Sequence, residues 1–202
     1  MLRKMIQFVA SYPWIYDQIQ NMAGIAIPVS PYLAQTANST VLDLGAGTGK
    51  FASLLPLSAR YIWLDIDRQK LNGFIAKKAP NLVILGDATR ICLKDKSVDY
   101  ALCIGLTHHL TDNEMINLFS EINRVTKYKL IFLDGVKDEK DEGSIISNLL
   151  WRYDRGSHPR QLREICDGLN SIFDTEQIDQ FKIYKRYVLC VCVPKQRSIA
   201  SL

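Results

Sequence analysis

Short, mostly apolar runs alternate with helix-like segments through the middle of this chain. The runs occupy residues 41–44, 61–64, 82–85, 98–104 and 130–133. A strand that is apolar along its whole length is buried on both faces, as the strands of a helix-covered parallel sheet are. We therefore expect an α/β fold that has a mostly parallel sheet with helices on both faces.

The end of the chain follows a different pattern. A helix over about 159–171 precedes two strand-like runs, near 173–183 and 186–193, with a short polar connection between them. Two strands joined so closely pair antiparallel, because a parallel crossover needs a dozen or more residues. The sheet is thus predicted to have seven strands, with an antiparallel strand at the end of the chain.

Two further local features concern helices. Residues 111–114 read Thr-Asp-Asn-Glu, a capping box that starts a helix with apolar residues at helical spacing. The aromatic-rich segment 1–38 is predicted to be helical but broken into pieces by Pro13, Pro28 and Pro31.

Composition excludes several classes of protein. The 202 residues are 48% hydrophobic and 23% charged with a net charge of +4, which argues against bulk disorder and against a strongly basic nucleic-acid surface. No apolar run approaches the ~18 residues of a membrane-spanning helix, and we expect no signal peptide. The five cysteines include no CxxC pair. We therefore predict no disulfide framework and no metal site, and expect the cytoplasm as the location.

The first strand leads into a glycine-rich turn. Residues 43–49 read Asp-Leu-Gly-Ala-Gly-Thr-Gly, and a helix is expected directly after them, over 50–55. Glycine at a strand-to-helix turn lets a ligand approach the backbone, whose N–H groups point toward it. The dinucleotide fingerprint GxGxxG places its third glycine one residue later, and the P-loop GxxxxGK[ST] is excluded by Leu44 and Phe51. Neither nucleotide motif fits this turn.

The segment VLDLGAGTGKF, residues 41–51, resembles motif I of the class I S-adenosylmethionine-dependent methyltransferases, and the resemblance extends over about residues 40–135. It implies a Rossmann-like methyltransferase fold, S-adenosyl-L-methionine as the cofactor and S-adenosyl-L-homocysteine as the product. The residues that the resemblance places at the methionine end of the cofactor are Asp43, Gly45, Ala46, Gly47 and Gly49.

Acidic residues follow the second and third predicted strands. Asp65 ends the second strand, where a carboxylate can accept hydrogen bonds from both ribose hydroxyls, and the resemblance implies this role. Asp67 is a second candidate that equally suits a helix N-cap. Ile66 is expected to present an apolar face to the adenine. The Gly-Asp-Ala element after the third strand resembles the family's adenine-binding element, which implies that role for Asp87 and Ala88.

The fourth strand runs into a loop with two adjacent histidines, His108 and His109. Ligands bind at the carboxyl ends of parallel strands, so we expect Gly105 at the cofactor and both histidines near the acceptor. The pair resembles the His-His-Leu of the type 11 small-molecule methyltransferases. Either histidine is a candidate base, because histidine titrates near neutrality, and shaping the loop is the structural alternative. The Asp/Asn-Pro-Pro-aromatic element of many amino-methyltransferases is missing, which argues against nucleobase amino groups.

One segment departs from the family pattern. Residues 124–129 read Arg-Val-Thr-Lys-Tyr-Lys, where related sequences have a Pro-Gly-Gly turn before the fifth strand. This departure keeps open a second function, a cofactor-binding scaffold or regulator without catalysis. A nucleotide-dependent oxidoreductase with an atypical glycine loop is a third.

Aromatic and basic residues in two flanking segments are the candidates for binding the acceptor. Tyr12, Tyr16 and Trp151 suit an aromatic, quinone-like or lipid-like acceptor, with simple packing of a lid as the alternative. A carboxylate or phosphate on the acceptor is expected to meet the basic residues Arg152, Arg155, His158 and Arg160.

Together these features predict one methyltransferase domain over residues 1–202. It would transfer a methyl group to a small molecule by in-line displacement, without nucleic acid as a partner, and act as a monomer or dimer. Its predicted parts are an N-terminal helical lid, a cofactor-binding core, an acceptor-side segment and a terminal β-hairpin, over 1–38, 39–135, 136–172 and 173–194.

Overall fold

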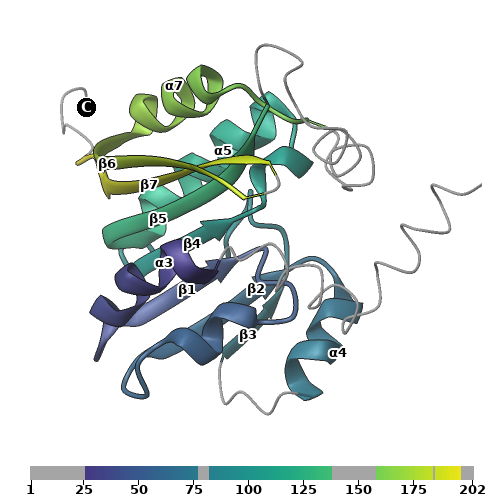
Figure 1. Cartoon of the computed structure of the whole chain (residues 1–202). Helices are drawn as coiled ribbons and strands as arrows, with labels where there is room; N and C mark the ends of the chain where they lie inside the picture. Colours follow the sequence, from purple (N-terminus) through teal and green to yellow (C-terminus); the bar gives the residue numbers. More distant parts are fainter. Residues whose placement is uncertain (1–25, 77–81, 138–157, 184, 197–202) are drawn as a thin grey trace, which may run out of the picture.

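The computed structural model describes residues 26–76, 82–137, 158–183 and 185–196. Seven strands within these ranges form one sheet, and helices pack on it (Figure 1). The strand order is β3-β2-β1-β4-β5-β7-β6. Pairing is parallel from β3 to β5, whereas β7 is antiparallel to both β5 and β6. The strands are β1 (Thr40–Leu44), β2 (Arg60–Asp65), β3 (Leu82–Leu85), β4 (Val98–Ile104), β5 (Thr126–Val136), β6 (Phe173–Lys182) and β7 (Arg186–Pro194).

This sheet confirms the predicted fold class. The antiparallel strand, however, lies one position inside the edge, because β7 inserts between β5 and β6. The helical elements are α3 (Ala26–Leu33), η1 (Ala34–Thr36), η2 (Lys50–Leu54), α4 (Arg68–Ala76), η3 (Thr107–His109), α5 (Asp112–Val125) and α7 (Leu162–Ile172).

Helices cover both faces of the sheet. On one face, α5 and α7 contribute Met115, Phe119 and Leu169 to a core shared with Leu42 and Leu44 of β1. On the other face, α3 packs on β4, β5 and β7, and α4 packs on β2. Alternate residues of each strand face opposite layers, so a strand buried in both layers must be apolar throughout.

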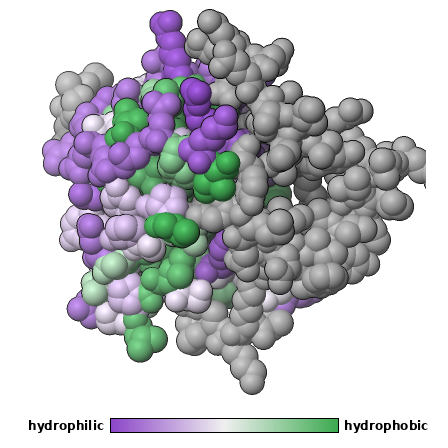
Figure 2. All heavy atoms as spheres, viewed as in Figure 1, coloured by the Kyte–Doolittle hydropathy of each residue, from purple (hydrophilic) through white to green (hydrophobic). Residues whose placement is uncertain are grey.

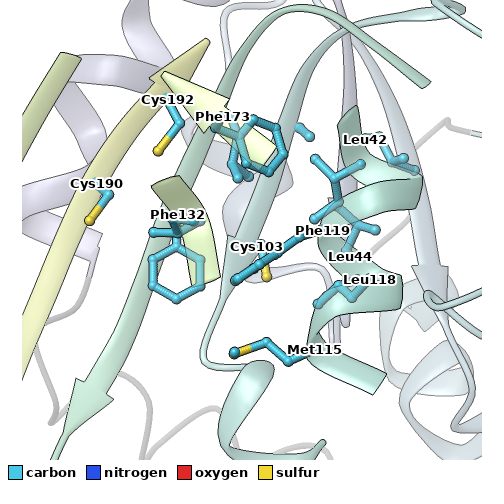
Figure 3. Packing of buried hydrophobic residues seen from close by; sticks show 14 of the residues in the cluster. Leu42, Leu44, Cys103, Met115, Leu118, Phe119, Phe132, Phe173, Cys190 and Cys192 are labelled. Atoms are coloured by element: carbon cyan, nitrogen blue, oxygen red, sulfur yellow. The ribbon is translucent and has the colours of Figure 1, made fainter. Parts of the chain in front are cut away.

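Aromatic rings and thiols fill the core between α5, α7 and the sheet (Figure 3). Phe119 meets Phe132 and Phe173 edge to face, with ring centroids 5.8 and 6.3 Å apart. Cys190 and Cys192 are buried beside them and free, and they pack there as small apolar residues. Burying one such phenyl ring contributes roughly 1.5–3 kcal/mol, so this cluster anchors the sheet to its helices.

The helix that precedes the fifth strand explains the missing Pro-Gly-Gly turn. It begins at the N-cap Thr111 with a complete capping box to Glu114, as predicted. It ends at Val125, and β5 begins at the next residue, Thr126, whose N–H still bonds to the carbonyl of Ile122. No separate turn is needed, because the chain passes from helix to strand within a single residue.

Two local predictions are corrected. Pro28 and Pro31 do not break 26–33, since both lie within α3. Pro28 sits in the first turn, where its missing N–H costs nothing, and Ser30 Oγ donates at 3.0 Å to the Ile27 carbonyl that Pro31 leaves without its usual donor. The helix expected over 50–55 is a 3₁₀ helix, Lys50–Leu54.

No helix in the described ranges is long and apolar enough to cross a bilayer. The described surface mixes hydrophilic and apolar side chains over the face shown in Figure 2.

Candidate active site

The glycine-rich turn lies at the carboxyl end of β1, beside the end of β2. Gly45, Gly47 and Gly49 all have φ between 56° and 70°. The N–H of Ala46 bonds to the carbonyl of Leu64 at 3.1 Å, which ties the turn to β2. At Gly49 a Cβ would lie 2.2 Å from the Phe74 ring, so close packing as well as φ requires glycine there.

Asp65 joins this turn to the end of β2. Its Oδ2 accepts a hydrogen bond from the N–H of Gly47 at 2.8 Å, and its Oδ1 accepts one from the N–H of Asp67 at 2.9 Å. Each carboxylate oxygen can accept a second hydrogen bond. The half-buried Asp65 is therefore held rigidly, yet retains the acceptor capacity that two ribose hydroxyls require.

Asp67 has a different environment. Its Oδ1 accepts from the N–H groups of Gln69 at 2.8 Å and Lys70 at 3.4 Å, at the start of α4. This is the geometry of a helix N-cap. The structure thus gives Asp67 the capping role that the sequence left open.

An apolar shelf and a polar turn follow β2 and β3. The Ile66 side chain is 75% exposed, and Leu85, which pairs with Asp65 across the strands, is 41% exposed. Asp87 Oδ1 accepts from the Thr89 N–H and hydroxyl, both at 2.8 Å, within an exposed turn, and Ala88 is partly buried. Exposed apolar side chains beside a polar edge are the surroundings that an adenine ring needs.

Asp43, by contrast, is buried within the sheet. Its Oδ2 accepts a hydrogen bond of 2.6 Å from the Tyr61 hydroxyl. Burial raises the pKa of Asp43 to about 7; the Tyr61 hydrogen bond opposes this rise and the charge of Asp65 adds to it. The Asp43 carboxylate thus bonds to Tyr61 inside the sheet. It supports the start of the glycine turn from beneath.

The histidine loop packs against the glycine turn. β4 is parallel to β1, and its end continues into Gly105, where φ is 64°. A Cβ on Gly45 would lie 2.9 Å from a methyl group of Leu106, so the two loops are in contact. His108 is buried, whereas His109 is exposed, and their ring centroids are 4.2 Å apart.

Asp134, at the end of β5, anchors this loop. Its Oδ1 lies 2.6 Å from His108 Nδ1 and accepts from the N–H of Gly135. Its Oδ2 accepts from the Thr107 N–H and hydroxyl. Burial alone would raise the pKa of Asp134, but the charge of protonated His108 and these hydrogen bonds lower it to about 2.

Sequence reasoning missed Asp134. The available signal was an acidic residue that ends the apolar run 130–133, in the same position that Asp65 holds after the second strand.

Arg160 was predicted to meet an acceptor anion, and the structure corrects this. The side chain is 5% exposed and donates to the carbonyls of Thr107 and Leu110, both at 2.6 Å, and to Asp112 at 2.9 Å. Its donors are used within the chain, because they hold the ends of the histidine loop. The N–H of His158 adds a bond of 3.0 Å to the His108 carbonyl, so His158 lies beside the loop.

Among the predicted acceptor residues, His158 and Arg160 lie in the described ranges. The others fall outside them: Tyr12, Tyr16, Trp151, Arg152 and Arg155.

Comparison with known proteins finds a related domain family. Residues 42–132 match the methyltransferase domain family, and this range holds the glycine turn, Asp65, Asp87 and the histidine loop. The matched segment is similar to methyltransferase domains and covers just under half of the chain.

Two curated relatives show the same similarity. The methyltransferase domain is 38% identical over 92 residues to an uncharacterized methyltransferase-like protein of Schizosaccharomyces pombe, covering 44% of this chain and 34% of that protein. It is 32% identical over 92 residues to the tRNA (carboxymethyluridine(34)-5-O)-methyltransferase of Arabidopsis thaliana, covering 45% of this chain and 22% of that protein. The chain therefore spans about a third of the length of the first relative and about a fifth of the length of the second.

A solved structure shares the fold. The 1,6-didemethyltoxoflavin-N1-methyltransferase of Burkholderia thailandensis, crystallised with 1,6-didemethyltoxoflavin and S-adenosylhomocysteine, has a TM-score of 0.73 at 17% identity. The match covers 96% of this chain and 88% of that chain. The methyltransferase fold therefore extends beyond the matched family range, into α7 and the β6–β7 hairpin.

Proposed function

We propose that this chain is an S-adenosyl-L-methionine-dependent methyltransferase that acts on a small molecule and releases S-adenosyl-L-homocysteine. The observation that carries the proposal is the bond from the Gly47 N–H to Asp65 Oδ2, which joins the glycine turn to the residue expected at the ribose. A glycine-rich turn, a fixed carboxylate and an exposed Ile66 offer three kinds of surface that suit the methionine, ribose and adenine parts of the cofactor.

The residues around this bond then have distinct roles. Asp65 holds the ribose, Ile66 covers the adenine, and Asp87 and Ala88 meet the adenine edge. Gly105 adjoins the cofactor from the β4 side. The glycine turn, in which Asp43 supports the residues, binds the methionine end through Gly45, Ala46, Gly47 and Gly49.

The histidine loop faces the acceptor in this proposal. The cofactor supplies an electrophilic methyl group on a sulfonium, and the chain aligns the acceptor for in-line displacement. Alignment alone can contribute on the order of 7–11 kcal/mol. His108 is the stronger candidate for a base, because it is buried beside a carboxylate, whereas His109 is exposed.

An aromatic, quinone-like or lipid-like acceptor is our proposal for the substrate class. Tyr12, Tyr16, Trp151 and the basic residues Arg152, Arg155 and His158 would bind it. The toxoflavin enzyme, whose title names a small heteroaromatic ligand, supports a small acceptor. The plant relative acts on tRNA, but its similarity is confined to 92 residues and leaves more than half of this chain unmatched.

The five free cysteines agree with a reducing compartment such as the cytoplasm. We further propose that the protein acts as a monomer or dimer. Its parts would be a lid, a core, an acceptor-side segment and a hairpin, with the bounds given in the sequence analysis.

Calorimetry tests the cofactor first. We expect S-adenosylhomocysteine to bind and NAD to release no heat; the opposite result would support the oxidoreductase alternative. Asp65→Ala should weaken S-adenosylhomocysteine binding about 10- to 150-fold, since a charge-assisted hydrogen-bonding group is worth roughly 1.5–3 kcal/mol. Asp67→Ala is the matched control: it removes a neighbouring carboxylate that caps α4, so binding should change little.

Two results would contradict the proposal. An Asp65→Ala affinity within about twofold of wild type would remove the ribose role, given the magnitude above. Cofactor binding without turnover on any labelled metabolite fraction would favour the scaffold alternative.

A further inference from the structure

A cavity opens beside the end of α3, toward the amino-terminal ends of β4 and β5. Its volume is about 300 Å³, at the lower end of the roughly 300–1,000 Å³ that small-molecule sites occupy. Side chains from α3, β4, β5, β6 and β7 line it, and none of the predicted cofactor residues is among them. The cavity is therefore separate from the candidate active site.

The inner wall of this cavity is apolar and aromatic. Ile131 and Val191 line it and are 2% and 4% exposed, as part of the core beneath α3. The rings of Tyr32 and Tyr100 also line it and are half-buried, and Tyr100 meets Tyr128 edge to face with ring centroids 6.2 Å apart. These surfaces suit an apolar or aromatic side chain of a ligand.

A β-bulge turns two polar neighbours toward the same cavity. Thr175 and Gln177 of β6 pair with consecutive residues of β7, so Glu176 between them is an extra residue. Successive side chains of a regular strand point to opposite faces, yet Glu176 and Gln177 both line the cavity. A bulge redirects side chains in this way and is frequent next to functional sites.

Asp179 ties two walls of the cavity together. Its Oδ2 accepts hydrogen bonds from the Tyr32 hydroxyl at 3.3 Å and from Gln177 Nε2 at 2.6 Å. Tyr32 belongs to α3 and Gln177 to β6. Contacts within the chain thus hold the walls in place without a ligand.

An ion pair forms part of the rim. Lys129 Nζ, on β5, lies 2.8 Å from Glu176 Oε2, on β6. Both side chains are partly exposed, 38% and 49%, so each can form a further contact with a ligand. Gln35 also lines the cavity, and its exposed side-chain amide forms no hydrogen bond with a described residue. The rim thus offers one cation, one anion and one amide.

We propose that this cavity binds a free α-amino acid with an aromatic side chain. The ligand's carboxylate meets Lys129 and Gln35, its ammonium meets Glu176, and its ring enters the apolar part of the cavity. Positive and negative groups then alternate, so the ligand gains two attractive contacts without breaking the ion pair. A ligand with only one charge meets the like charge of one partner, which disfavours simple amines and simple carboxylic acids. This proposal does not depend on the proposed function.

Fluorine NMR of 4-fluoro-L-phenylalanine with the full chain tests the ligand class. We expect the ¹⁹F line of the amino acid to broaden as protein is added. Two related compounds should bind less tightly: 4-fluorophenethylamine, which lacks the carboxylate, and 3-(4-fluorophenyl)propanoate, which lacks the ammonium. Absence of binding by the amino acid overturns the proposal, and so does equal binding of all three compounds.

Two variants of the rim test the charges, and both replace side chains that are partly exposed. Lys129→Met and Glu176→Gln should each weaken binding of the amino acid about two- to fivefold, the range for a partly exposed ion pair. Lys129→Met should also bind the amine more tightly than the wild type does, and Glu176→Gln the propanoate, because each variant removes the repelling charge. An unchanged order of preference in both variants overturns the charge assignment.

The same substitution at two exposed positions of β6 tests the location. Gln177 lines the cavity, so Gln177→Trp should fill it and abolish binding of the fluorinated amino acid. Gln180 does not line it, so binding should be retained in Gln180→Trp. Binding that survives Gln177→Trp overturns the location.

Competition with S-adenosylhomocysteine separates this cavity from the candidate active site, because that molecule itself ends in an α-amino acid. The fluorinated amino acid should stay bound when S-adenosylhomocysteine is saturating, and its displacement overturns the proposal of a separate site. Failure of S-adenosylhomocysteine to bind overturns the proposed function alone, and the two tryptophan variants then decide this proposal.

Discussion

Replacing Gly49 with alanine tests the packing beneath the glycine turn. Gly49 has φ of 70°, and a Cβ there would lie 2.2 Å from Phe74 Cδ2. Phe74 is 1% exposed and stacks on Trp63, with ring centroids 6.0 Å apart at 20°. The phenyl ring therefore has no solvent into which it can turn, and the new methyl group must displace the ring or the backbone.

Two costs add in this variant. A left-handed backbone conformation costs an L-residue roughly 1–2 kcal/mol. Displacing a packed ring costs about 1–3 kcal/mol, the range for overpacked cores. Replacing glycine with alanine also lowers the conformational entropy of the unfolded chain, which stabilises the folded protein by about 0.4–1 kcal/mol and offsets part of the loss. The net expectation is a loss of about 1–4.5 kcal/mol in the free energy of unfolding.

Urea unfolding, with the free energy extrapolated to water, measures this loss, and two glycines serve as controls. Gly105 has φ of 64°, but its Cβ would lie 3.8 Å from His108 Cε1, so Gly105→Ala carries backbone strain without a clash and should lose about 1 kcal/mol. Gly86 lies outside the left-handed region and its Cβ would be 3.6 Å from Ile84, so Gly86→Ala should stay within about 0.5 kcal/mol of wild type. Equal losses at positions 49 and 105 would refute the clash, and no loss at either would refute the strain.

Two further predictions concern stability. Burial raises the pKa of Asp43 to about 7, so the folded protein holds this proton more tightly than the unfolded chain. The stability from this group is fully present below about pH 4 and is lost as the pH rises through 7. The free energy of unfolding of Asp43→Asn, measured with urea, should therefore rise relative to that of the wild type between pH 4 and pH 8. A difference between the two proteins that does not change with pH would contradict the raised pKa. Thr111→Ala removes the exposed cap of α5 and should cost about 1 kcal/mol by thermal unfolding, with Thr111→Ser near wild type.

Much of the sheet could be predicted because burial on both faces leaves a local signature. A strand such as β4 reads as nearly continuous apolar sequence, and the capping box at Thr111 specifies a helix start within four residues. The ends of a strand were predicted less accurately where polar residues take part in the strand pairing. β5 begins at Thr126, four residues before the apolar run, because Lys127 and Lys129 pair at the sheet's amino-terminal edge with Asp99 and Glu176.

Several residues of the candidate cofactor site also lie close to one another in the sequence. Motif I and the acidic residue after the second strand follow one another across a single strand–helix–strand unit, and parallel pairing brings both strand ends to one edge. The structure added the Gly47–Asp65 hydrogen bond, which joins the two. It also showed that Asp67 is the N-cap of α4.

The sequence by itself determined the fold class, the glycine turn and the place of the histidine pair at a strand end. Tertiary structure alone decided what the histidines contact. Pairing of Ile104 with Leu133 brings the ends of β4 and β5 together, and this register sets Asp134 against His108, 26 positions away. Arg160 likewise became a buried support of the loop. Contacts of this kind depend on strand register and burial, which no local pattern of residues encodes.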